Sequence, residues 1–194
     1  MKKFKIALFA SGNGSNTINL LRYFNGNKRI KVETVLSNNA NAGVIEKCKS
    51  FGLEPVIFHN DSFKVGDDVL AYLKSKGIDY IILAGFLRKI PSLLIDSFPN
   101  KIINLHPSLL PKFGGKGMYG RNVHEAVSLS GDMVTGITIH TINTNYDEGD
   151  YIAQFYSKIQ PFEEIEVIEK KIRTLELTYL PVVVENYIML KNIG

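Results

Sequence analysis

The first half of the chain alternates short runs of β-branched and other apolar residues with segments of helical periodicity. The strand-like runs are residues 5–10, 32–37, 55–58, 80–84 and 101–105. Helical patterns between them pass through residues 20–24, 42–51 and 67–76, and a short helix is expected after Pro91. Such alternation requires right-handed crossovers, which build a mainly parallel sheet with helices on both faces. We therefore expect a doubly wound, Rossmann-like α/β fold.

The residue patterns in the second half of the chain predict an antiparallel extension of this sheet. Residues 134–142 alternate in character, which puts Thr138 and His140 on the face opposite their isoleucine neighbours. Residues 151–159 are the expected antiparallel partner strand. The pattern from residue 162 to about residue 190 is helical, and Pro181 is expected to break or kink it into two helices.

Length and composition narrow the class of protein. No repeat, low-complexity run or linker interrupts the 194 residues, so we expect a single domain over 1–194. The lone Cys48 cannot form an internal disulfide, which favours a cytoplasmic location. The apolar run at residues 6–10 is too short for a signal peptide, and no run approaches the ~18 apolar residues of a membrane span. A net charge of +4 suits anionic small molecules better than nucleic acid.

Function is expected at the carboxyl ends of the strands, where ligands bind in folds of this kind. The first such loop contains Gly14, Ser15 and Asn16 before a predicted helix, whose free N–H groups and dipole suit a phosphate. It lacks the third glycine of a dinucleotide fingerprint, because Thr17 stands there, and it lacks the lysine of a P-loop. A tight turn with Ser15 or Asn16 as helix cap explains it equally well.

A second candidate follows the last strand of the first half. Asn104 and His106 are two residues apart, so in extended chain they project from one face. An amide donor and a titratable imidazole together can stabilise an oxyanion and move a proton. A structural histidine bonded to a nearby carbonyl is the alternative, and the strand-end position favours function.

The remaining candidates are less specific. Asp147 lies in an acidic loop that a solvated hairpin would also explain, and neither its acidic neighbours nor the four histidines have metal-ligand spacing. Arg173 and Glu176 are three apart on a predicted helix, which is typical of a surface ion pair. The glycine-rich residues 114–120 predict a mobile loop before the helix that carries His124.

The combination of motifs is more specific than any part. SGNGSN, LAGFLRKI, INLHPSLLP, GITIH and a downstream Asp-x-Gly turn occur here in this order. The set resembles the phosphoribosylglycinamide formyltransferase branch of the folate-dependent formyltransferase family, from residue 5 to about residue 181. INLHPSLLP is diagnostic of the wider family, and SGNGSN indicates the glycinamide ribonucleotide branch.

The resemblance implies transfer of a formyl group from 10-formyltetrahydrofolate to the amine of glycinamide ribonucleotide in purine biosynthesis. By analogy, Asn104 and His106 stabilise the tetrahedral oxyanion, and protonated His106 then acts as the acid for the leaving folate nitrogen. Asp147 orients His106, favours its protonated form and, through a water, helps remove the proton of the amine. Oxyanion donors typically contribute ~10²–10³ in rate. This chemistry requires no metal.

The resemblance also implies two binding regions. The ribonucleotide, with its phosphate, would be held by Gly14, Ser15, Asn16, Arg173 and Glu176. The folate would be held by Leu87, Arg88, Lys89, Ile90, Lys64 and Asn104, together with the loop residues Asn143, Thr144, Asn145, Tyr146 and Asp147.

Three positions depart from the family pattern. Lys64 stands near the place of the usual arginine by the folate. The turn after Asp147 is Glu148-Gly149 where Gly-Gly is commoner, and Thr144 replaces an acidic residue. The glycine-rich loop differs from the usual histidine-containing one, so no catalytic role is assigned to His124.

Other functions remain as alternatives. Methionyl-tRNA formyltransferases share the HPSLLP signature but carry a further tRNA-binding domain, for which 194 residues are expected to leave no room. Sugar-nucleotide amine formyltransferases also usually extend further. A catalytically silent nucleotide-binding module would need none of Asn104, His106 and Asp147. We expect a monomer or homodimer without nucleic-acid or membrane partners.

Overall fold

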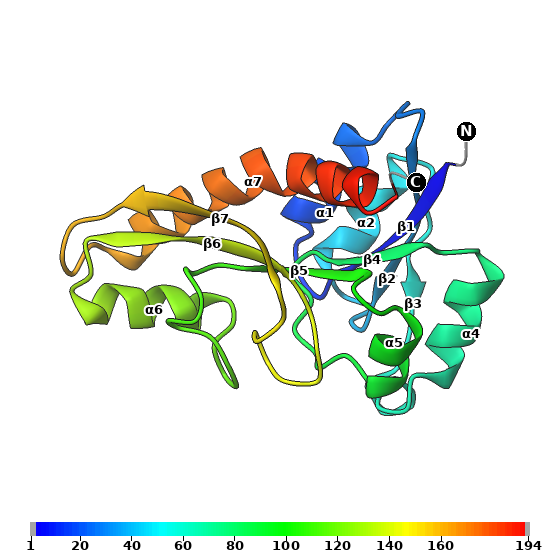
Figure 1. Ribbon diagram of the computed structural model, residues 1–194, viewed down its shortest axis with the longest axis horizontal. Coiled ribbons are helices and arrows are strands. Elements are labelled where there is room, and N and C mark those ends of the chain that lie inside the picture. Colours follow the sequence, from blue (N-terminus) through cyan, green and yellow to red (C-terminus); the bar gives the residue numbers. More distant parts are fainter. Residues whose placement is uncertain (1–2, 193–194) are drawn as a thin grey trace. The chain divides into compact units, whose positions relative to one another are not determined.

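The computed structural model describes residues 3–192 and divides after Ile103 into two compact units (Figure 1). Each unit is built around its own set of strands. Residues 1, 2, 193 and 194 of the expected 1–194 domain lie outside the described residues, and the single domain stays a prediction.

The first unit contains the alternating elements that the sequence predicts, together with a short helix over residues 60–63 that it does not predict. They are β1 (Phe4–Phe9), α1 (Ser15–Tyr23), β2 (Ile30–Ser37), α2 (Gly43–Lys49), β3 (Val56–Ile57), α3 (Asn60–Phe63), α4 (Asp67–Ser75), β4 (Tyr80–Leu83) and α5 (Ser92–Ser97). Its strands lie in the order β3-β2-β1-β4, and every neighbouring pair is parallel. Next along the chain is β5 (Ile102–His106), which spans the boundary between the units.

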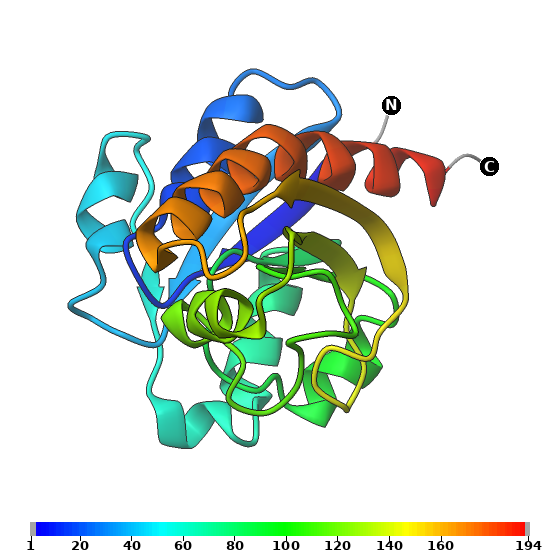
Figure 2. The ribbon, with the colours of Figure 1, turned by 90° about the vertical axis from the view of Figure 1, so that its left-hand side faces the viewer.

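Helices cover both faces of these parallel strands. The chain moves outward from β1 through β2 to β3 and then returns to β4, so right-handed crossovers put the helices before and after the return on opposite faces. Figures 1 and 2 show α1 and α2 on one side of the strands and α4 and α5 on the other. The doubly wound arrangement is thereby confirmed for this unit.

Aromatic packing supports the carboxyl ends of the strands in the first unit. Phe9 ends β1, and its ring lies 6.1 Å from that of Phe58 after β3 and 5.4 Å from that of Phe86 after β4. Phe58 also stacks on Phe63, with ring centroids 4.5 Å apart. Buried aromatic pairs stabilise the fold beyond the burial of their apolar surface, so these contacts help to fix the loops at this edge.

The second unit is built on an antiparallel pair of strands, as expected. Its elements are α6 (Arg121–Ser130), β6 (Val134–Thr141), β7 (Tyr151–Lys158) and α7 (Ile165–Leu190). β6 and β7 pair from Val134 opposite Lys158 to His140 opposite Tyr151, with a register shift between Ile139 and His140. Figure 2 shows α7, in orange to red, running along this yellow hairpin, and α7 also packs against α6.

The expected division at Pro181 is wrong, because α7 is one continuous helix of 26 residues. A proline inside a helix removes one backbone hydrogen bond and crowds the preceding turn. Here Pro181 and its neighbour Leu180 are buried, and the helix packs against β6, β7 and α6. Burial of the apolar side chains of α7 therefore stabilises the helix by more than the proline destabilises it. Because this burial depends on β6, β7 and α6, the sequence pattern around Pro181 does not predict it.

Candidate active site

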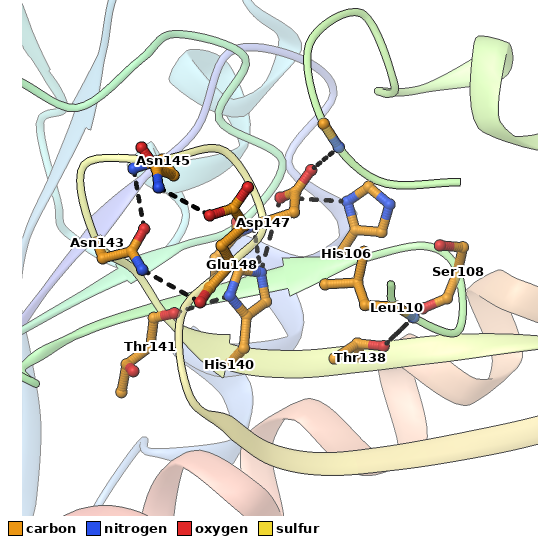
Figure 3. A network of polar contacts seen from close by, with 12 residues as sticks. His106, Ser108, Leu110, Thr138, His140, Thr141, Asn143, Asn145, Asp147 and Glu148 are labelled. Atoms are coloured by element: carbon orange, nitrogen blue, oxygen red, sulfur yellow. Dashed lines mark hydrogen bonds and ion pairs between the residues drawn. The ribbon is translucent and has the colours of Figure 1, made fainter. Parts of the chain in front are cut away.

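The carboxyl end of β5 presents two of the predicted catalytic side chains. Asn104 and His106 both belong to the second unit; Asn104 is half-buried and His106 is only 3% exposed. Nδ1 of His106 lies 3.5 Å from Oδ1 of Asp147, which comes from the loop between β6 and β7 (Figure 3). The structure thus brings together a histidine and a carboxylate that are 41 residues apart (147 − 106).

The other nitrogen of the His106 ring is held by the backbone. Nε2 lies 2.8 Å from the carbonyl oxygen of Phe113. A carbonyl only accepts, so Nε2 carries a hydrogen and Nδ1 is the nitrogen that faces the carboxylate. Phe113 has a φ of 57°, a conformation that is costly for a residue with a side chain. In this strained conformation the carbonyl of Phe113 points at the His106 ring.

Asp147 is held in a strained position of its own. Its φ is 57°, and its second carboxylate oxygen, Oδ2, accepts a hydrogen bond of 2.9 Å from the backbone N–H of Gly115. Two residues later, Gly149 approaches the Thr141 carbonyl so closely that a Cβ could not be accommodated. Only glycine therefore fits this turn, and Oδ1 of Asp147 is left facing His106 and also His140, a histidine on β6.

Side-chain hydrogen bonds shape the rest of this loop. Asn143 Nδ2 donates to the carbonyl of Glu148 over 3.1 Å, and Asn145 Nδ2 donates to the Glu148 carboxylate over 2.7 Å (Figure 3). Asn143, Asn145, Thr144 and Tyr146, all predicted to contact folate, are exposed. Glu148, where the family commonly has glycine, thus supplies contacts that order the loop.

His140 is a residue of this site that was not predicted. It is fully buried on β6 and lies between Asn104 and Asp147: Nε2 is 3.1 Å from Asn104 Nδ2 and 3.8 Å from Asp147 Oδ1. Burial lowers the pKa of His140, against the raising effects of the Thr141 carbonyl and Asp147. The signal in the sequence was its alternation with Thr138, which put both polar side chains on one face of a predicted strand.

Thr138 fixes the segment that follows His106. Its hydroxyl donates to the Ser108 carbonyl over 2.7 Å and accepts the N–H of Leu110 over 3.0 Å. Gln154 on β7 donates to the same hydroxyl and to the Leu110 carbonyl, each over 2.9 Å. A buried network whose members satisfy one another is rigid, so this one holds the chain between His106 and Phe113.

His124 lies on α6 and is also buried, with an exposure of 6%. Its Nδ1 has no hydrogen-bond partner among the described residues. Burial is the main cause that lowers the pKa of His124, so the neutral ring is favoured.

The predicted phosphate site lies at the start of α1 in the first unit. The helix begins at Ser15, and Gly14 occupies the cap position with a φ of 73° and no side-chain cap. Gly14 is also packed so tightly that a Cβ would lie 2.6 Å from Cβ of Val44. Ser15 is exposed and Asn16 is buried, and no acidic residue occupies the first turn. The positive end of this helix is therefore not neutralised from within the turn.

The predicted folate residues of the first unit differ in exposure. Residues 87–89 are exposed, whereas Ile90 is buried. The segment is tied to the first loop, because the backbone N–H of Leu87 donates to the Ser11 hydroxyl over 3.0 Å. Lys64 is exposed and pairs with Asp61 over 2.8 Å.

Arg173 and Glu176 lie on α7 in the second unit. Arg173 is exposed, and its guanidinium lies 3.7 Å from Glu169, one turn earlier in the helix. Arg173 is thus found in an ion pair with Glu169, and the pairing with Glu176 that was considered from the sequence stays a prediction. Glu176 is half-buried.

Residues 3–192 contain neither a cluster of metal-binding side chains nor a membrane-spanning helix. No group of three or more His, Cys, Asp or Glu residues has a geometry that could hold a metal ion. No helix in this part of the chain is both long enough and apolar enough to cross a membrane.

Comparison with protein families matches residues 4–184 to the formyl transferase family. A phosphoribosylglycinamide formyltransferase of Bacillus subtilis is 33% identical over 199 aligned positions, covering 100% of this chain and 98% of the relative. The one of Haemophilus influenzae is 31% identical, covering 93% and 85%. A chloroplastic one of Arabidopsis thaliana is 34% identical, and the match covers 88% of this chain but only 61% of that longer relative.

Solved structures resemble nearly all of the chain. The phosphoribosylglycinamide formyltransferase of Anaplasma phagocytophilum has a TM-score of 0.86 at 27% identity, covering 95% of this chain and 86% of the other. The glycinamide ribonucleotide transformylase 1 of Geobacillus kaustophilus has a TM-score of 0.85 at 30% identity, covering 94% and 97%. The predicted fold class, a mainly parallel sheet with a late antiparallel extension, is confirmed.

Proposed function

Since the chain belongs to the phosphoribosylglycinamide formyltransferases, within the formyl transferase family, we propose that it transfers a formyl group from 10-formyltetrahydrofolate to the amine of glycinamide ribonucleotide. The observation that carries the proposal is the His106 ring, held between the Phe113 carbonyl at Nε2 and the Asp147 carboxylate near Nδ1. A histidine with one fixed nitrogen and one nitrogen beside a carboxylate is suited to proton transfer.

The reaction assigns one task to each of three side chains. The uncharged amine attacks the formyl carbon, a C–N bond forms, and the carbonyl electrons move onto the formyl oxygen. Asn104 donates a hydrogen bond to this oxyanion, and donors of this kind act best when they are oriented beforehand. The intermediate collapses with cleavage of the bond to the folate nitrogen, which receives a proton from Nδ1 of His106.

Asp147 closes the proton balance. Through a water, it takes the proton that the amine loses. The side chains thus gain one proton from the amine for the one that His106 gives to the folate nitrogen. Afterwards the proton on the carboxylate returns to Nδ1 of His106 across the 3.5 Å gap between Nδ1 and Oδ1. The products are formylated glycinamide ribonucleotide and tetrahydrofolate, and the side chains return to their starting state without a metal.

Substrate binding is proposed for both units. The amides at the start of α1, over Gly14, Ser15 and Asn16, hold the phosphate, with Arg173 and Glu176 at the phosphate and ribose end. The folate is held by residues 87–90, by Lys64 and by the loop of Asn143 to Asp147. We further propose that one domain over 1–194 acts in the cytoplasm as a monomer or homodimer, without nucleic-acid or membrane partners.

The test is an acceptor assay on the purified full chain. With 10-formyltetrahydrofolate as donor, mass spectrometry should detect formylated glycinamide ribonucleotide and no formylated methionyl-tRNA or amino-sugar nucleotide. His106→Ala should abolish transfer while the circular dichroism spectrum stays unchanged. Turnover with methionyl-tRNA alone, or an active His106→Ala variant, would overturn the proposal.

A further inference from the structure

His140 is the one fully buried histidine of the site, and the reaction described above gives it no task. Its ring nitrogens have different partners: Nδ1 lies 2.7 Å from the carbonyl oxygen of Thr141, and Nε2 lies 3.1 Å from Nδ2 of Asn104. With 0% exposure the ring makes no contact with solvent. The contacts inside the protein therefore decide which nitrogen carries hydrogen.

The Thr141 carbonyl settles the tautomer. A carbonyl oxygen only accepts, so Nδ1 of His140 must carry a hydrogen. Burial disfavours a second proton on the ring and lowers the pKa of His140. Nε2 is consequently a bare acceptor, and the amide nitrogen of Asn104 donates to it.

This contact decides the orientation of the Asn104 side chain. If the amide were turned by 180°, its oxygen would face the lone pair of Nε2, and neither atom could donate. With the nitrogen toward His140, one of the two amide hydrogens is used and the other remains for a further acceptor. An asparagine without such a partner would sample both orientations, and only one of them offers this second hydrogen.

We propose that His140 is a positioning residue: by accepting one N–H of the Asn104 amide, it directs the other toward the formyl oxygen of the bound donor. The inference rests on the proposed function, because it assigns a use to the second N–H. It also explains why a fully buried imidazole stands where an apolar side chain would pack without polar partners.

The backbone around His140 is built to hold this arrangement. The β6–β7 register shifts between Ile139 and His140, and irregularities of this kind redirect side chains next to active sites. Thr141, whose carbonyl fixes the tautomer, donates its own N–H to the Asp150 carbonyl over 2.9 Å. The close approach of Gly149 to that same Thr141 carbonyl leaves no space for a side chain.

The neutral ring also keeps Asp147 available to His106. Oδ1 of Asp147 lies 3.5 Å from Nδ1 of His106 and 3.8 Å from Nε2 of His140. A hydrogen on Nε2 would compete for this oxygen and would point at the amide hydrogens of Asn104. With Nε2 as an acceptor, His140 therefore pairs with the Asn104 amide and leaves the Asp147 carboxylate to His106.

The test compares two replacements of His140, alone and combined with Asn104→Ala. His140→Phe removes the acceptor, and kcat should fall about 10- to 100-fold, below the ~10²–10³ expected for losing an oxyanion donor altogether, while KM for both substrates changes less than about threefold. His140→Gln offers an amide oxygen near the position of Nε2 and should recover most of the lost kcat. In the Asn104→Ala background, His140→Phe should have no further effect, because residues that act as a unit are not additive.

Nuclear magnetic resonance tests the arrangement without turnover. In the full-length protein, the ¹⁵N shifts of His140 should be those of a neutral ring with hydrogen on Nδ1, and the side-chain amide signals of Asn104 should move in His140→Phe but much less in His140→Gln. His59→Gln, which changes an exposed histidine of the first unit, is the matched control and should alter neither kcat nor these signals. Thermal unfolding and circular dichroism identify any variant that fails to fold.

The outcomes separate the two proposals. A wild-type protein without formyl transfer overturns the proposed function, whereas the tautomer and the amide signals still report on the contact. A hydrogen found on Nε2, wild-type kcat in His140→Phe, or losses from Asn104→Ala and His140→Phe that simply multiply would each overturn the positioning role alone.

Discussion

The two units offer their candidate residues in opposite ways. In the first unit the phosphate candidates depend on backbone: the left-handed Gly14 at the start of α1 and the amides of the first turn of the helix. In the second unit the catalytic candidates are buried or half-buried side chains linked to one another, and Phe113 and Asp147 both adopt a left-handed conformation. Backbone sites of this kind need a turn and a helix, whereas oriented side chains need a network and tolerate strain. The difference implies that damage to the Gly14 turn of the first unit should weaken binding of the ribonucleotide, and that damage to the catalytic side chains of the second unit should slow chemistry.

The largest expected effect is on turnover and concerns the second unit. Asp147→Asn removes the negative charge beside Nδ1 of His106 and the acceptor for the proton of the amine. Because general acid–base groups contribute ~10²–10⁴ in rate, kcat should fall by about 10³ with little change in KM for the ribonucleotide. Steady-state kinetics measures this, with the exposed Asp96→Asn on α5 as control. A matching fall in affinity for the ribonucleotide would contradict the catalytic role of Asp147.

A substitution in the first unit should have the complementary effect. Gly14→Ala forces a side chain into a position with φ of 73° and against Val44, at a cost of about 1–3 kcal/mol of unfolding free energy. The displaced turn should raise KM for the ribonucleotide by more than it lowers kcat. Gly12→Ala is the control, since a Cβ there meets nothing within 4 Å. An unchanged KM in a folded Gly14→Ala protein would argue against the phosphate site.

Thr138→Val tests whether the buried network of the second unit is needed beyond its catalytic members. The change keeps the shape but leaves the Leu110 N–H and the amide of Gln154 without the hydroxyl they contact. Each unsatisfied buried polar group costs about 1–3 kcal/mol, so urea unfolding should show a loss of that order and kcat should fall severalfold. A variant as stable as the wild type would mean that water replaces the hydroxyl.

The smallest expected effect is a change in the pH dependence of stability. The pKa of His124 lies below its ordinary value of 6.5 in the folded protein, so on acidification the unfolded chain binds the proton first. Its contribution to stability is therefore complete above pH 6.5 and is lost as pH falls through 6.5 toward the folded pKa. His124→Gln should flatten the unfolding free energy over this range, measured by urea titration at several pH values. A steeper dependence in the variant would reverse the sign of this assignment.

The regular parts of the fold were predictable because local patterns encode them. The alternation of strands and helices predicted the parallel strands of the first unit, and alternation of side chains predicted the β6–β7 pair. The continuous helix through Pro181 was not predictable, since its stability comes from packing against β6, β7 and α6. His140 was visible as a polar residue on a strand face, but its pairing with Asn104 was not.

By itself, the sequence determined the family and the chemical groups of the candidate site, because motifs such as INLHPSLLP record which residue types stand at the strand ends. Only the tertiary structure decided which nitrogen of each histidine faces which partner. Those assignments depend on the backbone carbonyls of Phe113 and Thr141. Because every residue has a carbonyl, the residue types in the sequence do not indicate which carbonyls contact a histidine. Their direction follows from backbone conformation, which the packing of distant segments sets.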